Sequence, residues 1–158
     1  MMESMALDLN GVHEYQQNRH PYLMIDAADE VVPGVSAKGY KQLTQDDWFF
    51  EVHFPGDPNM PGMLQIEAMV QLGALMVLTL PGNKGKVMYL TGATNVKFLR
   101  KVLPGERLQL ETKLISWKRG LGKCTGQGMV AGEIACKADF NIVMPDILSE
   151  YRVGAAEK

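Results

Sequence analysis

The residues best suited to chemistry in this 158-residue chain lie close together, between positions 53 and 67. His53 stands in a loop punctuated by proline and glycine, and Glu67 stands inside the apolar segment that follows. Histidine and glutamate are among the side chains that most often transfer protons near neutral pH. A carboxylate among apolar residues is costly to bury unless it has a partner or a function. The pattern predicts an acid–base site that acts on a ligand lying along an apolar helix.

The start of that helix offers a third chemical element. Proline is favoured in the first helical turn, so we expect the helix to begin near Pro61 and to end before Pro81-Gly82. Its first free N–H groups, near Gly62 and Met63, carry the positive end of the helix dipole. They are suited to polarising a carbonyl oxygen, as an oxyanion hole does.

Structural roles compete for the same residues. A lone histidine is often a hydrogen-bonded structural residue, and a buried glutamate can serve a hydrogen-bond network or a subunit seam. Gln71, one helical turn after Glu67, is the expected hydrogen-bond partner. Asp57, between a glycine and a proline, fits a turn-shaping role. The sequence has no nucleophile elbow, phosphate loop, dinucleotide motif or metal-ligand cluster, so proton abstraction beside a carbonyl is favoured over covalent catalysis.

The elements that must position these residues are one long helix and about six strands. The helix carries apolar residues on every face, which is typical of a buried helix. Alternating polarity and turn signals predict a short helix at 8–17 and strands at 22–32, 35–43, 87–102, 107–118, 123–131 and 133–143. The fold class is therefore α+β, with a single antiparallel sheet curled around the helix. The helix side that the sheet leaves open predicts at least a dimer.

The length favours one domain, 1–158, with a helical N-terminal segment at 1–17 and a C-terminal tail at 145–158. Residues 63–80 have the length of a membrane span, but Gln65, Glu67 and Gln71 argue against one. Cys124 and Cys136 lack metal-ligand spacing, which favours reduced cysteines in a cytoplasmic protein. A two-residue hairpin turn at 131–132 would place neither cysteine opposite the other.

Charge is unevenly distributed, although the net charge is −2. Residues 1–67 hold 11 acidic and 3 basic side chains, whereas residues 84–123 hold 2 acidic and 10 basic ones. This asymmetry indicates either solvated strand faces or a basic patch for an anionic partner. Nucleic acid is not expected, because no nucleic-acid motif interleaves aromatic residues with these lysines and arginines.

Taken together, these segments resemble a known enzyme family. The run HFPGDPNMPGMLQIEAMVQ closely resembles the signature of the FabZ-type 3-hydroxyacyl-[acyl-carrier-protein] dehydratases of the FabA/FabZ-like hot-dog family. The likeness extends to NRHPYLMID at 18–26, YLTG at 89–92, KF at 97–98 and VLPGE at 102–106. It therefore covers about residues 18–144, in the family's order.

The resemblance implies a hot-dog fold, a long helix wrapped by an antiparallel sheet. It also implies a homodimer, often assembled into a hexamer as a trimer of dimers, with sites that take histidine from one subunit and the acid from the other. His53 would remove the C2 proton of a 3-hydroxyacyl thioester, and Glu67 would handle the C3 hydroxyl. The Gly62 N–H would bind the thioester carbonyl. The product would be a trans-2-enoyl thioester, formed without cofactor or metal in fatty-acid or related acyl-chain synthesis.

The resemblance also suggests how the substrate is held. An apolar tunnel at the dimer interface would take the acyl chain, with Met63 and Ile66 among its lining residues. The acyl carrier protein is acidic, and Lys97, Arg100 and Lys101 in the basic segment are candidates for its docking surface.

Several positions depart from the family pattern. Gly56-Asp57-Pro58 resembles a sister class of dehydratase/isomerases, which carries Asp where this chain has Glu67. Gln65 and Thr91 replace residues that are usually smaller or apolar, which suggests a specialised substrate. Alternative functions on the same fold are an acyl thioesterase, an enoyl-thioester hydratase and a non-catalytic acyl-thioester-binding module.

Overall fold

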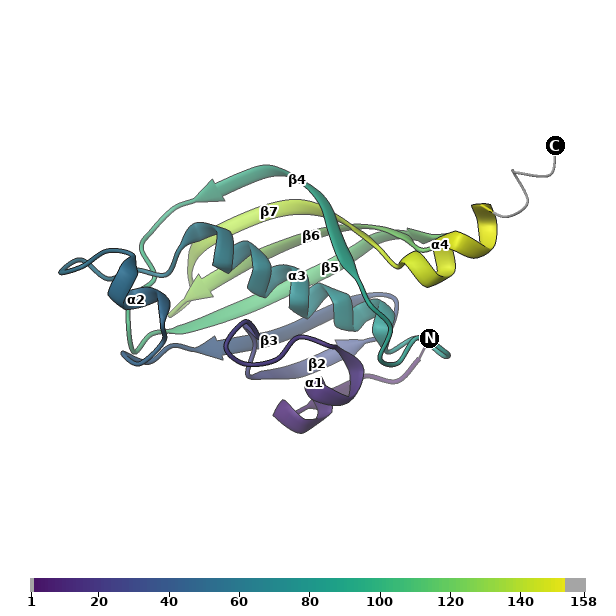
Figure 1. Cartoon of the computed structure of the whole chain (residues 1–158), viewed down its shortest axis with the longest axis horizontal. Helices are drawn as coiled ribbons and strands as arrows, with labels where there is room; N and C mark the ends of the chain where they lie inside the picture. Colours follow the sequence, from purple (N-terminus) through teal and green to yellow (C-terminus); the bar gives the residue numbers. More distant parts are fainter. Residues whose placement is uncertain (1, 153–158) are drawn as a thin grey trace.

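Helix α3, Gly62–Leu78, is the centre of the molecule. In the computed structural model, which describes residues 2–152, α3 lies across one face of a curved antiparallel sheet (Figure 1). Fourteen of its residues are buried, and the three that are not are Gly62, Met63 and Glu67. The helix is otherwise enclosed. Its accessible residues are thus those to which the sequence assigned a role at the site. No helix within residues 2–152 is long and apolar enough to cross a membrane.

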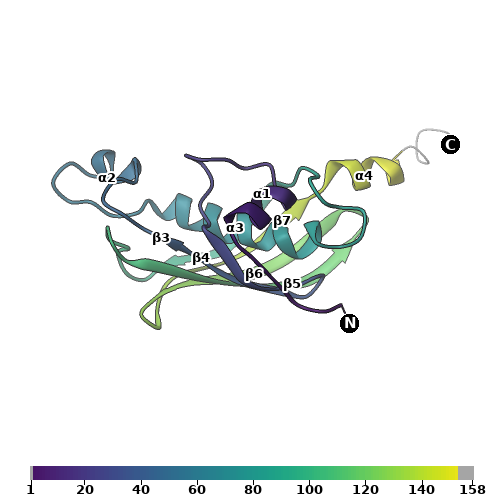
Figure 2. The same ribbon diagram turned by 90° about the horizontal axis from the view of Figure 1, so that it is seen from below.

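The sheet has seven strands in the order β1-β2-β3-β5-β6-β7-β4, and all neighbours are antiparallel. The strands are β1 Met5–Leu7, β2 Ala27–Val32, β3 Ser36–Gln42, β4 Tyr89–Phe98, β5 Arg107–Lys118, β6 Leu121–Val130 and β7 Glu133–Val143. The other helices are α1 Leu9–Tyr15, α2 Phe49–Val52 and α4 Pro145–Arg152. All four helices lie on the same side of the sheet (Figure 2).

This architecture confirms the predicted long helix on an antiparallel sheet and corrects some details. The predicted count of about six strands is one short, because the three residues of β1 are too few to show alternation. The strand predicted from residue 22 begins at Ala27. Before it, the Met24 N–H donates to the Gln71 side chain, 2.7 Å away, and not to a neighbouring strand. Of the predicted tail, residues 145–152 form α4 and the rest lies outside the described residues.

A bulge in the β6–β7 hairpin shifts the strand register that a two-residue turn at 131–132 predicts. The two-residue turn at 131–132 pairs Val130 with Glu133 as expected. The register then shifts by one residue between Met129 and Gly128, farther from the turn. Cys124 therefore faces Phe140, and Cys136 faces Gly128. The conclusion that the cysteines are not opposite one another holds, and both are free and buried.

Glycines on the inner face of the sheet let α3 approach closely. A Cβ on Gly39 would meet the Ala27 carbonyl oxygen and lie 2.9 Å from the Leu72 side chain of α3. A Cβ on Gly126 of β6 would fall 2.8 Å from the Met69 sulfur. Because neighbouring backbone and side-chain atoms already fill this space, the two positions set how near the helix lies to the sheet.

We expect Gly39→Ala to destabilise the protein by about 1–3 kcal/mol, since the added methyl group overpacks a contact with rigid backbone. Urea unfolding followed by circular dichroism measures the change. Gly92→Ala is the matched control, because a Cβ there would meet only Asn141, at an ordinary 3.9 Å. Equal stability of the two variants would contradict close packing at Gly39.

Burial also determines the reactivity of the cysteines. It raises the pKa of the Cys124 thiol to about 12 and that of Cys136 to about 11. Both thiols should resist a disulfide reagent at pH 8 in the folded protein and react at once in guanidinium. Since the thiolate is disfavoured only in the folded state, stability should fall as the pH rises above about 8.5. Rapid labelling of the folded protein would contradict the burial.

Candidate active site

The loop that carries His53 is built by its prolines and glycines. Helix α2 ends at Val52, and a tight turn follows in which Phe54 and Asp57 exchange backbone hydrogen bonds of 2.9 Å. Gly56, at φ +79°, occupies the turn position that requires a positive φ, directly after Pro55. The sequence therefore dictates this turn, and the turn places His53 at its base.

Backbone contacts select the tautomer of His53. Its Nδ1 lies 3.0 Å from the Asn59 carbonyl oxygen, and the Asn59 N–H donates to the His53 carbonyl at 2.9 Å. A carbonyl oxygen only accepts hydrogen bonds, so Nδ1 carries a proton, and in the neutral ring Nε2 is the nitrogen with the free lone pair. The ring is thus oriented as a proton acceptor through Nε2.

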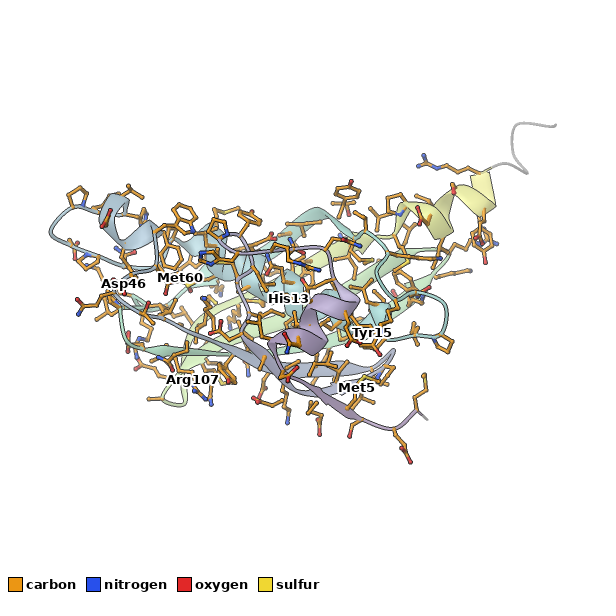
Figure 3. All side chains as sticks on the ribbon, turned by 60° about the horizontal axis from the view of Figure 1, so that its bottom comes forward. Met5, His13, Tyr15, Asp46, Met60 and Arg107 are labelled. Atoms are coloured by element: carbon orange, nitrogen blue, oxygen red, sulfur yellow. The ribbon has the colours of Figure 1, made fainter. Side chains whose placement is uncertain are left out.

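Two further contacts join the loop to the segment between β4 and β5. The Met60 N–H donates to the Val102 carbonyl at 2.8 Å. Lys101 contacts the Asp57 carboxylate at 2.9 Å, so the side chain of Asp57 makes an exposed ion pair, and its turn-shaping role remains a prediction. Figure 3 labels Met60 and Asp46 at one end of the molecule, while His13 and Tyr15 of α1 lie apart from them.

The first turn of α3 presents free N–H groups beside a hollow of about 510 Å³. The N–H groups of Leu64 and Gln65 donate to the Pro61 carbonyl. Those of Gly62 and Met63 have no acceptor within residues 2–152. The Phe98 ring packs against Gly62, where a Cβ would fall 2.6 Å from a ring carbon. Glycine is therefore required for this close approach, and its N–H can bind a carbonyl oxygen.

Glu67 is held by the side chain of Gln71, which confirms the partner predicted from helical spacing. Gln71 Nε2 donates to the Glu67 carboxylate at 2.8 Å and to the Tyr22 carbonyl at 3.0 Å. Its Oε1 accepts from the Met24 N–H, and its backbone carbonyl accepts from Gln16 at 3.0 Å. One oxygen of Glu67 is thereby fixed, and the carboxylate has a defined orientation.

Tyr22 is a neighbour of Glu67 that the sequence reasoning missed. Partial burial and the charge of Glu67 together raise the pKa of the Tyr22 hydroxyl, which keeps this group a neutral hydrogen-bond donor and acceptor. No spacing rule links the two residues, since Tyr22 precedes the first long strand and Glu67 lies in the helix. Only the hydrogen bonds of Gln71 to the 22–24 backbone bring them together.

Glu67 opens onto a groove of about 330 Å³ between α3, the start of β4 and the segment after α1. Figure 1 shows the beginning of β4 crossing α3. The apolar part of the lining comes from Val70, Ala74, Leu78, Val87, Met88, Tyr89 and Leu90. Of the predicted tunnel residues, Met63 is 72% exposed and lines the hollow beside Gly62. Ile66 is 2% exposed inside the core, and its place in a tunnel remains a prediction.

Within one chain, the predicted site residues do not share a single hollow. Glu67 lines the groove, and Gly62 lines the hollow at the start of α3. His53 lines neither of them. Within one chain, the structure therefore does not gather these three residues into one site.

The predicted docking residues differ in their surroundings. Arg100 contacts Glu106 at 2.6 Å and Glu133 at 3.3 Å, and Lys101 contacts Asp57. Lys97 makes no ion pair within the described part of the chain and lies directly opposite Lys137 of β7.

Comparison with known proteins identifies the family. Residues 17–139 match the model of the FabA-like domain family. The chain belongs to the FabA-like family. This FabA-like chain is 42% identical over 138 residues to a 3-hydroxyacyl-[acyl-carrier-protein] dehydratase FabZ of Clostridium novyi, covering 86% of this chain and 96% of the relative. It is 36% identical to the FabZ of Bacillus subtilis, covering 87% and 98%. The similarity to these relatives shows that the protein is a FabZ-type dehydratase.

Solved structures show the same fold. The dehydratase heterocomplex ApeI:P from Xenorhabdus doucetiae has a TM-score of 0.74 at 17% identity, with 85% of this chain and 90% of that chain covered. A hypothetical thioesterase from Streptococcus pneumoniae, solved with coenzyme A, has a TM-score of 0.56 at 12% identity and covers 72% and 80%. The FabA-like protein therefore has the hot-dog fold that its sequence implied.

The Gln71 network gives a stability prediction. Gln71→Leu leaves the Met24 N–H, the Tyr22 carbonyl and Glu67 without their partner, at about 1–3 kcal/mol for each buried group that stays unpaired. Urea unfolding should show a loss of several kcal/mol. Gln17→Leu is the control, because Gln17 makes one exposed bond to the Gly85 carbonyl and should change stability by less than about 0.5 kcal/mol. A mild Gln71 variant would contradict the network's role.

Proposed function

We propose that this protein dehydrates a 3-hydroxyacyl thioester, carried on acyl carrier protein, to the trans-2-enoyl thioester. The observation that carries the proposal is that the fold provides both a proton acceptor and an oriented carboxylate. His53 presents an unprotonated Nε2, and Glu67 is fixed by Gln71 at the mouth of a largely apolar groove. The curated relatives, named as FabZ dehydratases, support the same reaction.

The reaction divides into roles that these groups can fill. His53 Nε2 takes the C2 proton, and the electron pair of that C–H bond forms the C2–C3 double bond. The C3–O bond breaks, and Glu67 supplies a proton, directly or through water, so that the hydroxyl leaves as water. The Gly62 N–H, with Met63 beside it, stabilises charge on the thioester carbonyl oxygen. The two side chains exchange protons with solvent before the next turnover.

The working unit of the proposal is a homodimer, in which each site combines His53 of one subunit with Glu67 of the other. Strand β4 supports this arrangement, because it is an edge of the sheet and nine of its ten residues are exposed. Tyr89, Leu90, Val96 and Phe98 are among them. A long apolar edge strand invites pairing with another chain. Assembly of dimers into a hexamer remains an expectation from the family.

The groove beside Glu67 is the proposed site of the acyl chain. It runs along one face of α3 from Glu67 through Val70 and Ala74 to Leu78, about 16 Å at the rise of an α-helix. Met63 would contact the thioester end, near Gly62, and Ile66 would support the wall from the core. The carrier would dock near Lys97, Arg100 and Lys101. The two free cysteines favour a cytoplasmic location for the protein.

The reaction is tested by incubating the protein with 3-hydroxyacyl and trans-2-enoyl thioesters. Absorbance of the conjugated enoyl group and release of free thiol are followed together. Interconversion without thiol release is the expected result. Thiol release would indicate a thioesterase, and binding without turnover a non-catalytic module, and either would overturn the proposal.

The assignment of residues is tested by subunit mixing. His53→Ala and Glu67→Gln should each lower kcat by about 10²–10⁴-fold. When the two inactive variants are co-expressed, mixed dimers have one intact site each, so activity should return to about a quarter of wild type. Each variant co-expressed with itself is the control. Failure to recover activity would place both residues in one chain's site or remove one of them from the mechanism.

A further inference from the structure

Two lysines face each other on the outer side of the sheet, away from α3. Lys97 of β4 and Lys137 of β7 are direct cross-strand partners. Their neighbours Ala138 and Cys136 are buried on the inner side, so the two ammonium groups share the outer face. Like charges directly opposite one another destabilise a sheet. Neither lysine has an ion-pair partner among residues 2–152.

The same face carries further unpaired positive charge. Lys113 of β5 lies opposite Thr125, and Lys123 of β6 lies opposite Asn141. Neither of these lysines forms an ion pair within the described residues. We call Lys97, Lys113, Lys123 and Lys137 the outer lysine cluster.

The carboxylates on this face are engaged by neutral donors. Asn95 donates to Asp139 at 2.8 Å, and hydrogen bonds from Asn95 and Thr125 lower the pKa of the Asp139 carboxyl. Gln127 lies between Glu111 and Lys137 in the sheet and donates to Glu111 at 3.3 Å. Within residues 2–152, the lysines of the outer lysine cluster therefore form no ion pair with these carboxylates.

The cluster surrounds shallow hollows. One of about 300 Å³ is lined by Lys97 and Lys137 together with Asn95, Thr125 and Asp139. A second of about 230 Å³ adjoins it and is lined by Lys113, Lys137 and Glu111. Because the lysines line a concave part of the surface, an acidic protein can contact several of them at once.

We propose that the outer lysine cluster, centred on Lys97 and Lys137, is the docking surface for the acidic carrier protein. This inference rests on the proposed function and extends it to residues on β5, β6 and β7. Charge complementarity selects the partner: an acidic protein supplies the missing carboxylates. Continuity with the site supports the position, since Phe98, the residue after Lys97, packs on Gly62 at the thioester-binding end of α3.

The structure also ranks the docking candidates. Arg100 and Lys101 already contact Glu106, Glu133 and Asp57, so an acidic partner would have to displace these contacts. Lys97 and Lys137 have nothing to displace, and an anion between them would relieve their repulsion. They therefore contribute most to the attraction.

The test is the double variant Lys97→Glu/Lys137→Glu. The double variant exchanges one like-charged pair for another, so the protein should still fold. Circular dichroism and Tm measurements verify this. Titration with unacylated carrier protein should show Kd raised at least about tenfold at low salt, with the difference shrinking as salt screens the charges. KM for a carrier-bound substrate should rise in parallel, while turnover of a small N-acetylcysteamine thioester should match wild type.

Lys118→Glu is the control, since Lys118 is exposed at the far end of β5 and its reversal changes the net charge in the same sense, by −2 against −4 in the double variant. It should leave carrier binding within twofold of wild type. An unchanged Kd in the double variant, or equal weakening by Lys118→Glu, would overturn the docking surface. Carrier binding is measured without turnover, so a wild-type protein that binds carrier but lacks dehydratase activity would refute the proposed function and not the docking surface.

Discussion

Helix α3 must be covered on all sides, and the rest of the structure depends on that constraint. Its sequence is apolar around its full circumference, so an exposed face would cost about 25 cal/mol for each Å² of apolar surface left in water. The curved sheet covers one side, with Gly39 and Gly126 allowing close approach. The segment after α1 and the start of β4 approach the other side and leave the groove beside Glu67.

A polar network inside this cover makes the site possible. Gln71 lies in the helix interior and satisfies backbone groups of the 22–24 segment while holding Glu67. A buried amide is tolerated because both ends of its side chain are paired. The same network that fixes the N-terminal segment over the helix therefore orients the carboxylate. Stability and chemistry depend on one side chain.

The opposite end of the site is organised by a loop and a helix terminus. Turn chemistry at 54–57 places His53, and the carbonyl of Asn59 selects its tautomer. Gly62 supplies a free N–H because it begins a helix and because Phe98 packs where a side chain would be. His53 and Glu67 do not line the same hollow of one chain. In the proposed homodimer, the exposed apolar residues of the edge strand β4 would contact the second chain.

Local rules in the sequence determined the long buried helix, its limits at Pro61 and Pro81, the strands β5 and β7, and the Glu67–Gln71 contact. These features follow from periodicity, turn chemistry and helical spacing, which act over a few residues. The residues suited to acid–base chemistry were also visible, since their types and positions are written in the chain. Tertiary structure alone decided the β6–β7 bulge, the strand β1, the closeness of Tyr22 to Glu67, and the pairing of Arg100 and Lys101 with carboxylates while Lys97 faces Lys137. Each of these depends on contacts between segments far apart in the chain, and such contacts are set by packing around α3, which no local pattern encodes.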